Sequence, residues 1–68
     1  METTKISEMF RAYMPDHTIV RCAANRICVT DTVVGREAVY DPVRRIIMDT
    51  GVRSDVTMMM RVIEKSLM

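Results

Sequence analysis

The last third of the chain decides the predicted fold; from Asp41 to Met68 it has the sequence DPVRRIIMDTGVRSDVTMMMRVIEKSLM. Asp41 followed by Pro42 is typical of a helix start, because aspartate caps the first N–H groups and proline fits the first helical position. Gly51 suits the left-handed residue that ends a helix, and Ser54 suits the cap of the next one. The stretch therefore predicts two short amphipathic helices joined by a tight turn at Gly51.

The second of these predicted helices has more apolar surface than one core contact needs. Its core stripe comprises Val56, Met59, Met60, Ile63 and Leu67. Met58 and Val62 widen the apolar arc to about 200° when the residues are plotted at 100° intervals. A chain of 68 residues buries too little surface to be strongly stable alone. We therefore predict a homodimer with Met58 and Val62 in its interface, while a central core helix in a monomer is the alternative.

The part of the chain before this stretch predicts one helix followed by strands. An apolar stripe at helical spacing predicts a helix over residues 4–14. Pro15 stops it, because the residue before a proline avoids the helical region. Residues 18–23 and 27–34 are rich in β-branched side chains, which favour strands. Residues 37–40 fit either a short third strand or an irregular approach to the next helix.

Together these elements predict a single small α+β domain over residues 1–68. The predicted order is an N-terminal helix, an antiparallel β-hairpin or three-stranded sheet, and then two C-terminal helices. The length of the hairpin loop decides which residues face each other. A three-residue loop at 24–26 places Cys22 opposite Cys28, whereas a loop one residue shorter places Cys22 opposite Ile27.

The charge and the hydropathy pattern narrow the class of protein. The chain has 10 Lys and Arg against 9 Asp and Glu, a formal net charge of +1. Charge alone therefore does not indicate nucleic-acid binding. No apolar run approaches the length of a membrane span, and no long apolar segment follows Met1 as in a signal peptide. We expect a cytoplasmic protein with no membrane partner.

The residue types that carry chemistry do not form a catalytic or metal-binding pattern. His17 is the only histidine, and with Cys22 and Cys28 it lacks the spacing of zinc ligands. No nucleophile has an evident base, and no glycine-rich loop precedes a helix to hold phosphate. Asp31, Glu37 and Asp41 are interpreted as solvated loop charges. We expect no enzymatic activity, no cofactor and no metal site.

Residues 44–56 resemble a helix-turn-helix DNA-binding domain. They combine a predicted helix, a turn glycine with an apolar residue after it, a capping serine and the start of a second helix. In that family the second helix enters the major groove and its first side chains meet the bases. The resemblance implies a transcriptional regulator that binds DNA without a cofactor. The residues that it places at DNA are Arg44, Arg45, Arg53, Ser54, Asp55, Thr57, Met58 and Arg61.

Two other interpretations use the same residues. The helix pair is similar to ribbon-helix-helix repressors, whose dimers contact DNA with strands; that resemblance implies Arg26, Thr30 and Thr32. A plain helical hairpin on a small sheet needs no DNA at all. The alternative function is a protein-interaction module that inhibits a host enzyme or immune complex, of the anti-CRISPR-like kind that phages and mobile elements encode. The small size of the chain and its eight methionines favour this alternative.

Overall fold

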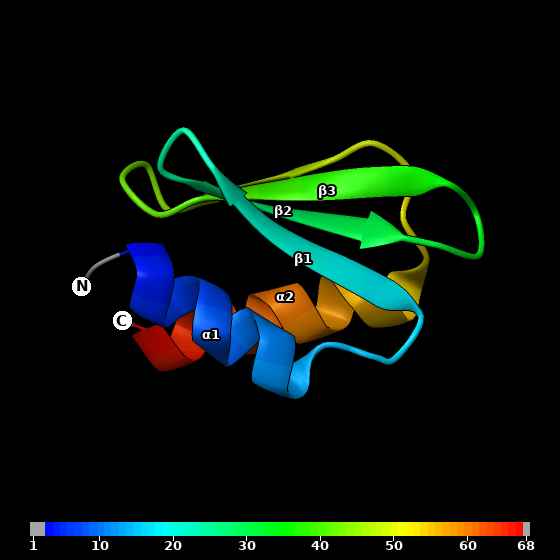
Figure 1. Cartoon of the computed structure of the whole chain (residues 1–68), viewed down its shortest axis with the longest axis horizontal. Coiled ribbons are helices and arrows are strands. Elements are labelled where there is room, and N and C mark those ends of the chain that lie inside the picture. Colours follow the sequence, from blue (N-terminus) through cyan, green and yellow to red (C-terminus); the bar gives the residue numbers. More distant parts are fainter. Residues whose placement is uncertain (1–2, 68) are drawn as a thin grey trace.

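The computed structural model describes residues 3–67, in which two helices cover one face of a four-stranded antiparallel sheet (Figure 1). The elements are helix α1 (Thr3–Tyr13), strands β1 (Thr18–Ala23), β2 (Arg26–Asp31), β3 (Arg36–Asp41) and β4 (Ile46–Asp49), and helix α2 (Ser54–Leu67). The strands lie in the order β1-β2-β3-β4, so each one pairs with the next along the chain. Within residues 3–67, no helix has the length and apolarity to cross a membrane.

The predicted order of elements is wrong after β3. Residues 46–49 do not form a helix but pair with β3 as strand β4, so α2 alone follows the sheet in the described part of the chain. Asp41 does accept the N–H groups of Val43 and Arg44, as a cap would, at 3.0 and 3.2 Å. The chain leaves this turn at Arg45, whose φ is 57°, before a second helical turn forms. The cap signal was real, but it belongs to the four-residue turn between β3 and β4, in which the N–H of Arg45 donates to the carbonyl of Asp41.

The loop between β1 and β2 has two residues, Ala24 and Asn25. Both have positive φ values, 51° and 61°, as a type I′ turn requires. The register pairs Cys22 with Ile27, so the shorter of the two predicted loops is present and the two cysteines do not face each other. Both are free thiols. Residues 37–40 belong to the third strand, β3, which settles the alternative left open by the sequence.

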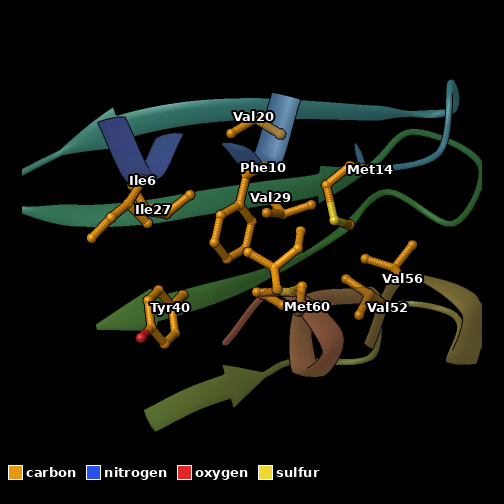
Figure 2. Close-up of a cluster of buried hydrophobic side chains, with 12 residues drawn as sticks. Ile6, Phe10, Met14, Val20, Ile27, Val29, Tyr40, Val52, Val56 and Met60 are labelled. Atoms are coloured by element: carbon orange, nitrogen blue, oxygen red, sulfur yellow. The ribbon is translucent and has the colours of Figure 1, made fainter. Parts of the chain in front are cut away.

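The core lies between the helices and the sheet (Figure 2). The ring of Phe10 in α1 stacks on Tyr40 in β3, with 5.6 Å between the ring centroids. Met60 of α2 is fully buried in the same cluster. The predicted core stripe of α2 is buried or partly buried along its length. The end of α1 differs from the apolar stripe predicted for this helix. Tyr13 is 62% exposed, and Met14, the next residue, is buried in the core instead.

Ala24→Gly should raise the free energy of unfolding by roughly 0.5–1 kcal/mol, because glycine adopts a positive φ without the steric cost that alanine has. Urea denaturation measures the change. Ala23→Gly is the matched control: Ala23 lies in β1, where glycine should lower stability by roughly 0.5–1 kcal/mol. A less stable Ala24→Gly variant would contradict the two-residue turn.

Candidate functional site

A cleft of about 470 Å³ lies between the edge strand β4 and helix α2. Its lining residues are Arg45, Ile46, Ile47, Arg61, Glu64 and Lys65. Three of the four charged side chains are cationic: Arg45 comes from the turn between β3 and β4, and Arg61 and Lys65 come from α2. The fold thus brings Arg45 and Arg61, both singled out from the sequence, to one cleft. Lys65 lies one helical turn after Arg61.

The β3–β4 turn that presents Arg45 is organised by Asp41. This carboxylate is 6% exposed and accepts two backbone N–H groups of the turn. It also lies 3.7 Å from the guanidinium of Arg26 and 4.0 Å from that of Arg44. The Arg44 side chain remains 71% exposed. Arg44 and Arg45 are therefore adjacent on a defined turn, with Arg45 at the cleft and Arg44 in solvent.

The predicted DNA contact Arg53 is bound to the buried carboxylate of Asp31. Its Nε and its backbone N–H both donate to Asp31 Oδ2, at 3.0 and 3.2 Å. The N–H of Val33 donates to the other carboxylate oxygen at 3.0 Å. Burial alone would raise the pKa of Asp31, but these hydrogen bonds and the positive charge of Arg53 lower it to about 2. Asp31 has no exposed surface and is not the solvated loop charge that the sequence predicted.

His17, Asp31 and Asp55 converge next to this ion pair. Nε2 of His17 lies 3.2 Å from Oδ2 of Asp55, and the three residues offer atoms within 4.8 Å of one another. Such a set resembles metal ligands, but the guanidinium of Arg53 already supplies a positive charge at Asp31. We interpret the group as a polar cluster that connects the loop after α1 to the start of α2.

Asp49, at the end of β4, joins the sheet to α2. One of its oxygens accepts the N–H groups of Gly51 and Val52 at 2.8 and 3.0 Å. The other accepts the hydroxyl of Thr57 at 3.1 Å, so this predicted DNA contact makes a bond within the fold. The N–H of Gly51 is the main cause that lowers the pKa of Asp49, and the charge of nearby Arg61 acts in the same direction. Gly51 has a φ of 117°, a backbone conformation that favours glycine at this position.

The outer surface of the helices carries the apolar residues predicted for a dimer interface. Met58 is 66% exposed and Val62 is 56% exposed. Beside them an apolar groove of about 170 Å³ runs between α1 and α2. Its lining residues are Met9, Tyr13, Met59, Val62, Ile63 and Ser66. Ser54 and Asp55 lie at the exposed first turn of α2.

The site differs from the sequence prediction in its composition. Because residues 46–49 form β4, the helix pair that carried the helix-turn-helix resemblance is not formed. Lys65 and Glu64 at the cleft were not singled out, although Lys65 follows Arg61 at the spacing that places two residues on one side of a helix. Comparison of the chain with protein-family models, curated proteins and solved structures finds nothing that matches.

Asp31→Asn should lower the free energy of unfolding at pH 7 and flatten its decline between about pH 4 and pH 2. The folded-state pKa of Asp31, about 2, lies below its ordinary value of 3.8. Its ionised form therefore stabilises the folded state above about pH 4, and this contribution is lost as the pH falls through the folded pKa. Urea unfolding at pH 7, 4 and 2.5 measures the effect.

Asp16→Asn is the control for this experiment, because it makes the same charge change on an exposed side chain of the loop after α1. It should leave both the stability at pH 7 and the acid decline close to those of the natural chain. Equal losses in the two variants would show that Asp31 has no special role.

Proposed function

We propose that the protein is a small, non-enzymatic, cytoplasmic DNA-binding regulator that holds the DNA backbone at the cleft between β4 and α2. The observation that carries the proposal is the convergence of Arg45, Arg61 and Lys65 on the lining of one open cleft. Phosphate oxygens receive a large share of protein–DNA hydrogen bonds, mostly from arginine and lysine. The planar guanidinium also matches phosphate geometry with two parallel donors.

The net charge of the whole chain does not describe the charge at the cleft. Asp31 pairs with Arg53, and Asp41 lies near Arg26 and Arg44, so these two carboxylates have their own cationic partners. Asp49 lies near Arg61, but Arg45 and Arg61 both border open space. Glu64 is the one carboxylate on the described lining, so the cleft itself is net positive. Local charge, more than the sum over the chain, determines anion binding at a surface.

The other residues at this surface have separate proposed roles. Arg44 is exposed on the same turn as Arg45 and supplies a second phosphate contact. Ser54 at the first turn of α2 is the candidate for a contact to a base. Arg53 acts through position, because its bond to Asp31 sets where α2 begins.

The second candidate function is a protein-interaction module of the phage or mobile-element kind that inhibits a host enzyme or immune complex. The observation in its favour is the apolar groove between α1 and α2, which is lined partly by Met9 and Met59. Methionine is flexible and polarizable and adapts to the surface of a partner. A partner protein on this groove would leave the basic cleft free.

Arg45→Ala and Arg61→Ala should each weaken binding to a labelled random-sequence duplex of 20 base pairs several-fold at 50 mM salt. Each should also reduce the slope of log Kd against log salt by about 0.9, the value expected for one lost phosphate contact. Fluorescence anisotropy between 25 and 200 mM salt measures both effects.

Arg21→Ala is the matched control, because Arg21 is 67% exposed, lies on β1 and pairs with Glu37 at 3.8 Å. The variant makes the same charge change away from the cleft and should leave the salt slope unchanged. Three equal effects, or no binding of the natural chain at tens of micromolar, would reject the cleft as a DNA site. The second outcome would leave the protein-interaction module as the preferred function.

A further inference from the structure

The exposed side of α2 has a symmetric order of side chains. Asp55, Met58, Val62 and Lys65 all lie on the side of the helix away from the core residues Val56, Met60 and Ile63, within about 80° of arc at 100° per residue. Counted along the helix, Asp55 and Lys65 are equally far from residue 60, and so are Met58 and Val62. The order is therefore acid, apolar, apolar, base.

We propose that two copies of the chain associate through this side of α2. The two helices pack antiparallel, and the two-fold axis passes between them at the level of residue 60 along the helix. In that arrangement Asp55 of each copy faces Lys65 of the other, and Met58 of each copy packs on Val62 of the other. The two-fold symmetry forms every contact twice. The two Asp55 residues lie about 15 Å apart along the helix direction, because ten residues separate positions 55 and 65. The register therefore brings unlike charges together and keeps like charges apart.

The exposed apolar side chains on this side of α2 favour contact with a second protein surface over contact with water. Met58 is 66% exposed and Val62 is 56% exposed, and such apolar side chains gain free energy when a second surface covers them. The side chain of Asp55 is 52% exposed, so it can reach a second copy while it lies next to His17. The apolar groove with Met9 and Tyr13 continues this surface onto α1.

The size of the helical face also suits a second copy. The molecule extends 30 × 22 × 19 Å, and Figure 1 shows the helices along the longest of these axes on one side of the sheet. A face of about 30 by 19 Å matches the lower range of stable interfaces, about 600 Å² per partner. The dimer needs both helices to reach this area, which is why the groove between them belongs to the interface.

Charge reversal tests the register without DNA, so its result is independent of the proposed cleft function. Asp55→Lys and Lys65→Asp should each raise the dimer Kd at least about tenfold, because each places like charges together at two symmetric positions. The double variant Asp55→Lys with Lys65→Asp should restore the dimer to within a few-fold of the natural Kd. Sedimentation equilibrium of the full chain from 1 to 200 µM measures Kd, and circular dichroism checks that each variant is folded.

Two further variants separate the interface from general effects of charge. Met58→Lys should give a folded monomer of 7.8 kDa. Arg21→Glu reverses an exposed charge on β1, on the face of the sheet away from the helices, and should leave the Kd unchanged. A natural chain that stays monomeric up to 200 µM would overturn the proposal. So would a dimer that both single reversals leave intact, or a double variant that fails to recover while folded.

Discussion

The carboxylate of Asp31 is the interaction on which the arrangement of α2 depends. It has no exposed surface, and a buried ionised group is stable only when donors surround it. The N–H of Val33 supplies one donor from the turn after β2, and Arg53 supplies two more from the residue that precedes α2. The carbonyl of Arg53 then accepts the N–H groups of Val56 and Thr57, which begins the helix. One side chain on β2 thus fixes both a strand turn and the start of a helix 22 residues later.

This constraint gives α2 three sides with different uses. Met60 and its neighbours face the sheet, as Figure 2 shows. Arg61 faces β4 across the cleft, and Met58 faces solvent. Apolar packing alone does not fix the rotation of a helix sharply, because the hydrophobic effect is non-directional. The hydrogen bonds of Arg53 and Thr57 at the first turn do have direction, so they set which residues border the cleft and which lie outside.

The sequence predicted the elements that depend on local pattern and missed the one that depends on pairing. The stripe with Phe10 and the stripe with Met60 predicted α1 and α2, and β-branched runs predicted β1 and β2. Strand β4 was missed because Asp41 and Gly51 carry signals that helices and turns share. In the structure Asp41 begins the four-residue turn between β3 and β4. The N–H of Gly51 donates to the carboxylate of Asp49 at the end of β4. A strand of four residues is stable only against the free edge of β3, which no local pattern contains.

The same distinction explains what the sequence revealed of the site. Arg45 and Arg61 were singled out for a helix pair that does not exist, yet β4 places both at one cleft. Asp31 was interpreted as a surface charge because burial of a carboxylate depends on a distant partner, Arg53, that the pattern around residue 31 does not reveal.

The basic cleft and the apolar outer side are compatible with each other because they occupy different sides of α2. Arg61 follows Met58 by three residues, which places the two side chains about 60° apart around the helix. Lys65 lies between these two directions, at the rim of the cleft and the edge of the outer side. A second copy on the outer side would therefore contact Lys65, while Arg45 and Arg61 would remain accessible to a phosphate. Two copies would carry two such clefts related by two-fold symmetry, which is the arrangement that binding to two successive sites on DNA requires.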